Sequence, residues 1–170
     1  SAPTLDMQLL IAMLLDPSSS KTELLSTHKT WANRHENIPK KPMFWERDLD
    51  ISCGPKRVGY VCHFFGASTM NGVAQLIKSH DRSKFEIYAY DDSAEGQEGK
   101  PTADHWRKTG LMDDRELAEC IFNDRIDILV ELNGMVPGNR YNTFMLRPAP
   151  IQINWGNYPG TLGLKCITFA

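Results

Sequence analysis

The chain has 170 residues, 24% of them charged and 41% hydrophobic, and its formal net charge is −2 at pH 7. This composition is that of a globular protein with one domain or slightly more, so an intrinsically disordered chain is not the expectation. No basic stripe with interleaved aromatic residues occurs, and we therefore expect no nucleic acid among the partners.

The N-terminal part of the chain predicts two helices. The first, residues 4–15, is apolar on most of its surface but too short to span a bilayer, and no Lys or Arg precedes it as in a signal peptide. Pro17 interrupts this run, and a following serine is a typical helix N-cap. The second helix carries Leu24, His28 and Trp31 at helical spacing and extends to about residue 36.

These features predict a helical hairpin over residues 1–38 and a linker over residues 39–56, which holds three prolines and one glycine. With neither a membrane span nor a leader, we expect a cytoplasmic protein that is soluble and has no membrane partner. The four cysteines are far apart and lack CxxC spacing, so we expect reduced thiols and no metal site.

From residue 57 onward, strand-like and helix-like segments alternate. Strands are predicted at 57–64, 84–90, 125–132 and 150–155. Helices are predicted around 73–77, around 103–108, from a capping box formed by Asp113 and Glu116, and around 140–146. This alternation predicts an α/β fold, with a mostly parallel sheet and helices on both of its faces.

In such sheets, ligands bind beyond the carboxyl ends of the strands. Three loops qualify, at residues 64–72, 133–140 and 156–163, and each contains glycine, which lets backbone approach a ligand closely. Each of the three loops is also compatible with an ordinary turn.

The motifs of several common α/β enzymes are missing. Gly66 and Gly72 are too far apart for a dinucleotide fingerprint, and neither a phosphate-binding GK[ST] end nor a GxSxG nucleophile elbow occurs. Asp91 and Asp92 follow the second strand and are interpreted as a solvated acidic loop. Periodicity and motif scanning alone thus predict an α/β domain with an unknown ligand.

A collinear set of motifs between Arg57 and Gly163 is more specific: RVGYV, HDRSKFEIYAY, ADHWRKTGLMDD, RIDILVELNG, GNR, RPAPIQINW and YPGTLG. It resembles the catalytic region of the O-GlcNAc transferase family, also called SPINDLY-like or glycosyltransferase family 41. The helical hairpin resembles the segment that joins this family's tetratricopeptide repeats to its catalytic part.

The resemblance implies a glycosyltransferase of the GT-B type, which has two Rossmann-like halves with a cleft between them. Such an enzyme moves N-acetylglucosamine from UDP-GlcNAc, its donor substrate, to Ser or Thr hydroxyls of a protein or peptide acceptor, without a metal or other cofactor. Residues 57–170 then correspond to the N-terminal half, and the donor-binding C-terminal half is absent. Because half a cleft cannot preorganise a transition state, we expect the isolated chain to be inactive. The apolar face left without its partner half predicts self-association.

Some of the family's site positions hold the same residue in this chain, and others hold a different one. Ser68 occupies the position of the family's active-site histidine, and a serine cannot titrate near neutrality, so the catalytic residue stays unknown. Met135 occupies an aromatic or histidine position, for which packing is the alternative role. Gly156 and Asn157 replace the family's Leu-Gly before the matching Tyr-Pro-Gly-Thr. The implied substrate-binding residues are Gly66, Ser68, Asn133, Gly134, Met135, Arg140, Gly156, Asn157, Tyr158, Pro159, Gly160 and Thr161.

These departures leave a second hypothesis open. The chain would then be a non-catalytic, diverged binding or assembly module that retains the fold.

Overall fold

The computed structural model describes residues 2–43, 54–63, 65, 71–93, 102–136, 138–156 and 158–169. Five strands form one sheet: β1 (Lys56–Cys62), β2 (Phe85–Asp91), β3 (His105–Lys108), β4 (Ile128–Glu131) and β5 (Ile151–Asn154). Their order is β3-β2-β1-β4-β5, and every neighbouring pair is parallel. The predicted parallel α/β sheet is confirmed.

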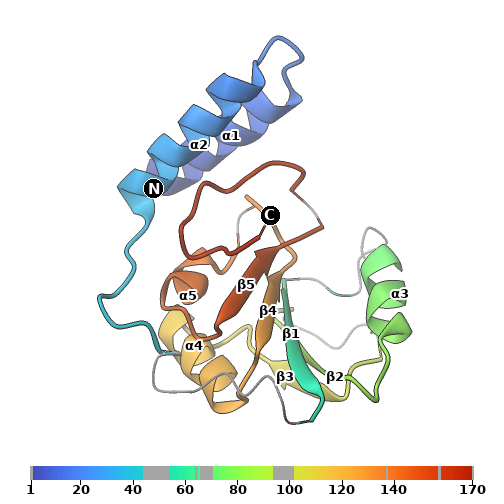
Figure 1. Ribbon diagram of the computed structural model, residues 1–170. Coiled ribbons are helices and arrows are strands. Elements are labelled where there is room, and N and C mark those ends of the chain that lie inside the picture. The colour runs from blue at the N-terminus through green and yellow to red at the C-terminus, as the bar shows by residue number, and fades with distance from the viewer. Residues whose placement is uncertain are drawn as a thin grey trace.

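Helices cover both faces of this sheet, as predicted (Figure 1). On one face lies α3 (Asn71–Ser79), whose Val73 and Ile77 pack in one core cluster with β1 and β2. On the other face lie α4 (Asp114–Asn123) and α5 (Tyr141–Met145), which supply Leu117 and Phe144 to a second cluster. Because both faces are covered, β1 is buried at every position from Val58 to its end, which explains its apolar run without alternation.

The predicted capping box at the start of α4 is confirmed. The Asp113 carboxylate accepts hydrogen bonds from the backbone N–H groups of Arg115 and Glu116, at 2.9 and 2.8 Å. The Glu116 carboxylate accepts in return from the backbone N–H of Asp113, at 2.9 Å. Three backbone N–H groups that the helix itself cannot pair are thereby satisfied, which fixes where the helix begins.

The predicted helical hairpin is formed by α1 (Ala2–Leu15) and α2 (Lys21–His35), with Ser20 as the N-cap of α2. Leu10 of α1 and Trp31 of α2 belong to the same core cluster as α4 and α5. At the end of α2, Glu36 accepts a hydrogen bond from the backbone N–H of Cys166, at 2.9 Å. The hairpin therefore packs on the C-terminal segment, as Figure 1 shows. Residues 44–53 of the predicted linker lie outside the described residues.

The helix predicted around residues 103–108 is wrong, because His105–Lys108 form the edge strand β3. Its residues pair in parallel with β2, from Tyr88–His105 to Asp91–Lys108. The His105 ring stacks on the Tyr88 ring, with 4.3 Å between their centroids. Since β2 offers a free row of backbone hydrogen-bonding groups, pairing with it outweighs the weak helical pattern of so short a segment.

Candidate functional site

The carboxyl ends of the strands form the candidate site, as expected for an open parallel sheet. Of the loop after β1, Phe64 and residues 66–70 lie outside the described residues, and so do Asn157 and Pro137 in the other loops. The predictions for Gly66, Ser68 and Asn157 therefore stay predictions.

Glu131, the last residue of β4, organises the loop that follows. Its side chain is fully buried, and its carboxylate accepts hydrogen bonds from the backbone N–H groups of Asn133 (3.0 Å) and Gly134 (2.7 Å). Gly134 has φ +70, a conformation that favours glycine. Burial raises the pKa of Glu131 to about 7, although the two N–H groups act in the opposite direction.

Asn133 ties this loop to the end of β1. Its side-chain carbonyl oxygen accepts from the backbone N–H of His63 at 2.7 Å. Its amide nitrogen is buried, makes no hydrogen bond within the described part of the chain, and lines neither of the two cavities described below. Met135, predicted as a substrate contact or a packing residue, is 1% exposed and lies in the core cluster.

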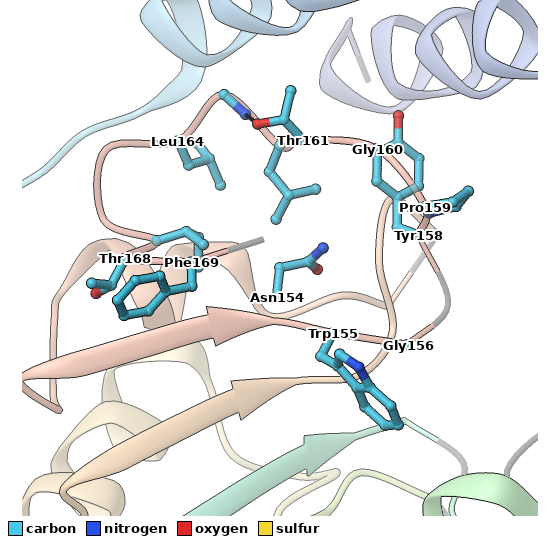
Figure 2. A pocket seen from close by; sticks show the side chains of 13 residues that line it. Asn154, Trp155, Gly156, Tyr158, Pro159, Gly160, Thr161, Leu164, Thr168 and Phe169 are labelled. Carbon is cyan, nitrogen blue, oxygen red and sulfur yellow. Dashed lines mark hydrogen bonds between the residues drawn. The ribbon is translucent and has the colours of Figure 1, made fainter.

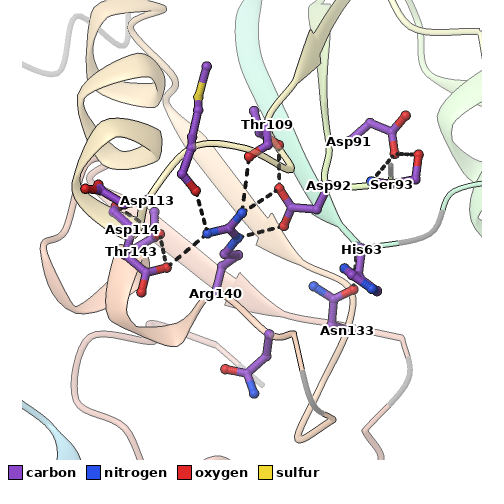
Figure 3. A network of polar contacts seen from close by, with 12 residues as sticks. His63, Asp91, Asp92, Ser93, Thr109, Asp113, Asp114, Asn133, Arg140 and Thr143 are labelled. Carbon is purple, nitrogen blue, oxygen red and sulfur yellow. Dashed lines mark hydrogen bonds and ion pairs between the residues drawn. The ribbon is translucent and has the colours of Figure 1, made fainter. Parts of the chain in front are cut away.

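Arg140 is the centre of a polar network at the same edge of the sheet (Figure 3). Its guanidinium donates to both carboxylate oxygens of Asp92, at 2.8 and 3.1 Å, and also to the carbonyl oxygens of Thr109 and Met112. Its remaining donor faces Asp114 at 3.5 Å. All N–H groups of the Arg140 guanidinium therefore face partners within the chain. Through these bonds Arg140 links the loops after β2, β3 and β4.

The interpretation of Asp91 and Asp92 as a solvated acidic loop is wrong. Asp91 is 1% exposed and pairs with Lys108 at 2.8 Å, while Asp92 is 5% exposed and pairs with Arg140. Burial alone would raise the pKa of Asp91, but hydrogen bonds from Lys108 and Ser93 outweigh it and lower the pKa. Buried carboxylates of this kind require such cationic partners.

A cavity of about 200 Å³ adjoins the Arg140 network. The exposed ring of His63 contributes to its wall, and the ring lies close to Gly138, at which an added Cβ would stand 3.3 Å from the His63 Nδ1. The lining residues are His63, Asp92, Gly110, Asp114, Gly138, Asn139 and Arg140.

A larger cavity, of about 580 Å³, lies under the loop that follows β5 (Figure 2). Five of the predicted substrate-binding residues line it: Gly156, Tyr158, Pro159, Gly160 and Thr161. Its volume falls within the range of about 300–1,000 Å³ typical of small-molecule sites. The structure thus gathers these five residues around one cavity, whereas Asn133, Gly134, Met135 and Arg140 do not line it.

The helical hairpin holds this loop in place. His28 of α2 is buried, its Nδ1 bonds the carbonyl oxygen of Leu24 at 2.6 Å, and its Nε2 bonds the hydroxyl of Tyr158. Since a carbonyl oxygen can only accept, Nδ1 carries the hydrogen and Nε2 accepts from the tyrosine. Gly163, with φ +68, lies so close to α2 that an added Cβ would be 2.8 Å from the backbone of His28.

Sequence reasoning missed two residues of this edge, Asp92 and Asn154. Asn154 lines the larger cavity and is 4% exposed. The signal for Asn154 was present, because Gln152 and Asn154 place two amide side chains at alternate positions of a strand that was predicted to be buried.

Within the residues that the structure describes, no group of three or more His, Cys, Asp or Glu side chains could hold a metal ion. Over the same residues, no helix has both the length and the apolar character needed to cross a membrane.

Several known proteins are similar to this chain. The SPINDLY protein of Hordeum vulgare, described as a probable UDP-N-acetylglucosamine–peptide N-acetylglucosaminyltransferase, is 28% identical over 169 residues, which are 94% of this chain and 18% of that protein. The SEC protein of Arabidopsis thaliana, described in the same terms, is 31% identical over 119 residues, 66% of this chain and 12% of that protein.

Among solved structures, a mutant of the O-GlcNAc transferase of Thermobaculum terrenum superposes with a TM-score of 0.84 at 25% identity. The match covers 97% of this chain and 32% of that one. The chain therefore spans about a third or less of the length of these relatives. The model of the family described as glycosyl transferase family 41 matches residues 18–169, nearly the whole sequence. This chain is a member of glycosyl transferase family 41.

Proposed function

We propose that the chain is the N-terminal half of the catalytic region of a protein O-GlcNAc-type glycosyltransferase of the GT-B type. Such an enzyme transfers N-acetylglucosamine from UDP-GlcNAc to Ser or Thr hydroxyls of cytoplasmic proteins. The observation that carries the proposal is the cavity of about 580 Å³ formed by Gly156, Tyr158, Pro159, Gly160 and Thr161 at the carboxyl end of β5. The names of the family relatives support the donor and the acceptor class.

In this proposal the chain binds and orients the donor sugar but does not complete the reaction. The open edge of the sheet provides one wall of a cleft, and a second half must provide the other wall. Stabilising a transition state requires groups held in place on both sides of the reacting atoms. The isolated chain is therefore expected to be inactive, and the α1–α2 hairpin is expected to connect it to preceding tetratricopeptide repeats.

The test is transfer of radiolabelled N-acetylglucosamine from UDP-GlcNAc to an acceptor protein. The isolated chain and the longest natural reading frame that contains it are compared. Transfer by the longer protein alone is expected. Gly156→Val should abolish it, because φ at Gly156 is +108 and a β-branched residue cannot adopt that conformation without strain. Gly72→Ala is the control, since an added Cβ at this helical position meets nothing within 4 Å.

A second candidate function is a non-catalytic binding or assembly module. It is favoured by the saturated N–H groups of Arg140, which leave that side chain no donor for a ligand phosphate. Calorimetric titration of the isolated chain with UDP-GlcNAc and with UDP separates the two functions. A dissociation constant below the millimolar range would argue against the second function, because a half-site that has lost its contacts should bind weakly.

Self-association is part of the same proposal. Leu9, Leu15 and Leu25 of the hairpin are 55%, 76% and 41% exposed, and exposed apolar residues of this kind support association. Light scattering at high protein concentration should detect species larger than the monomer. A strictly monomeric chain would contradict this part of the proposal.

A further inference from the structure

The side-chain amide of Asn154 lines the larger cavity and makes no hydrogen bond within the described part of the chain. Parallel register places Gln152 and Asn154 on the same face of β5. Gln152 uses its amide nitrogen fully, because Nε2 donates to the carbonyl oxygens of Phe144 (2.8 Å) and Cys166 (2.9 Å). Asn154 is 4% exposed, and its backbone N–H donates to the carbonyl oxygen of Phe169 at 3.0 Å.

The Asn154 amide points into the cavity under the loop after β5. Figure 2 shows it extending from the end of the strand toward the space between Thr161, Leu164 and Tyr158. Desolvating an amide without giving it hydrogen bonds is unfavourable, and a side chain such as Leu would fit an apolar wall better. The hydrogen bonds of this amide are therefore completed by whatever fills the cavity, water or the polar groups of a ligand.

We propose that Asn154 is a sugar-binding residue that recognises a pyranose ring through two neighbouring hydroxyl groups. Its carbonyl oxygen accepts from one hydroxyl, and its NH₂ group donates to the next. The proposal rests on the proposed function and deepens it, since it assigns the polar contact that selects the sugar of the donor.

The distribution of polar groups favours a sugar over a nucleotide base. Asn154 lies at the base of the cavity, and Thr161 and Thr168 lie on different sides of it (Figure 2). A pyranose carries hydroxyl groups around its whole rim and can meet groups in several directions. A base such as uracil offers its donor and acceptor groups along one edge, which matches this arrangement less well.

The first test is a titration of the ¹⁵N-labelled chain, followed by NMR at the side-chain NH₂ signals of Asn154. N-acetylglucosamine and UDP-GlcNAc should each shift these signals with saturation, and UDP alone should leave them in place. A shift with UDP but not with N-acetylglucosamine would assign Asn154 to the base and overturn the inference. The absence of any shift at millimolar sugar would overturn it as well.

The second test separates a binding role from a structural role. Asn154→Leu should weaken the affinity for UDP-GlcNAc about tenfold, as expected for the loss of one to two hydrogen bonds, and leave the affinity for UDP unchanged. The same variant should leave the urea midpoint of unfolding nearly unchanged, because the amide has no hydrogen bond to lose within the described part of the chain. The matched control is Gln152→Leu on the same face, which should lower the midpoint, since two buried carbonyl oxygens lose their donor.

If Asn154→Leu lowers the urea midpoint as Gln152→Leu does, the amide is structural and the inference fails. The inference also fails if Asn154→Leu binds UDP-GlcNAc as tightly as the unchanged chain does. These readouts do not depend on transfer. Transfer by the longer protein with unshifted Asn154 signals would refute this inference alone, whereas shifted signals without transfer would refute the proposed function alone.

Discussion

Replacing Arg140 by Met should destabilise the fold strongly, because the change leaves the buried carboxylate of Asp92 without its cation. The Arg140 guanidinium bonds both oxygens of Asp92, whose side chain is only 1% exposed. After the substitution Asp92 keeps the hydrogen bond from the Thr109 hydroxyl at 2.6 Å. Breaking a buried ion pair by removing one partner costs about 3–5 kcal/mol. Since the Arg140 side chain is 15% exposed, we expect the lower end, about 3 kcal/mol.

The measurement is urea-induced unfolding, followed by tryptophan fluorescence and circular dichroism. The matched control is Arg115→Met, because Arg115 forms an exposed pair with Glu119 one helical turn away, at 3.0 Å. Such surface pairs contribute about 0.3–0.5 kcal/mol. The double variant Arg140→Met with Asp92→Asn should recover part of the loss, since it removes the unpaired charge.

Equal losses for Arg140→Met and Arg115→Met would refute this reasoning. The Arg140 network would then be as weak as an exposed ion pair. A double variant no more stable than Arg140→Met would show that the cost comes from lost packing rather than from the carboxylate.

Three further predictions concern the same edge of the sheet. Because burial raises the pKa of Glu131 from 4.5 to about 7, the folded chain holds a proton that the unfolded chain releases. Its contribution to stability is therefore complete below pH 4.5 and is lost as the pH rises to about 7, by roughly 3 kcal/mol. Glu131→Gln should flatten this part of a plot of urea midpoint against pH, and parallel curves for both proteins would contradict the assignment. Tyr158→Phe should cost about 1–3 kcal/mol in urea unfolding, because His28 Nε2 loses its buried donor; no loss would mean that this hydrogen bond does not hold the hairpin. Gly163→Ala should lower the free energy of unfolding by about 1–3 kcal/mol, because φ is positive there and an added Cβ would meet the backbone of His28. A thermal midpoint equal to that of the unchanged chain would contradict both the strained conformation and the close packing of this loop on α2.

The strands and helices could be predicted where an apolar run was long or where a capping box or a proline marked the end of an element. The run around β1, the capping box at Asp113 and the proline-flanked β5 each carry a local signal, and the structure confirms them. The edge strand β3 carries no such signal, because its four residues become a strand only through pairing with β2.

The polar side of the site was harder to predict for a related reason. Asp92 looks like a loop residue in the sequence, and its partner Arg140 lies 48 positions later. The burial of one and the pairing of both arise only when the sheet brings the ends of β2 and β4 together. Asn154 was overlooked because its neighbours are apolar, although its alternation with Gln152 marked one face of the strand as polar.

A side chain can recognise a ligand at little cost only if its hydrogen-bonding groups are not already bonded to other parts of the chain. Arg140, Asp92 and the Glu131 carboxylate already bond other parts of the chain, so each would have to give up a protein bond to gain a ligand bond. Such an exchange contributes little net free energy. The side chain of Asn154 makes no hydrogen bond within the described part of the chain, so a ligand hydroxyl group would replace only water there. The polar recognition that we propose is therefore assigned to the end of β5, while Arg140 and Asp92 tie together the loops after β2, β3 and β4 beside it.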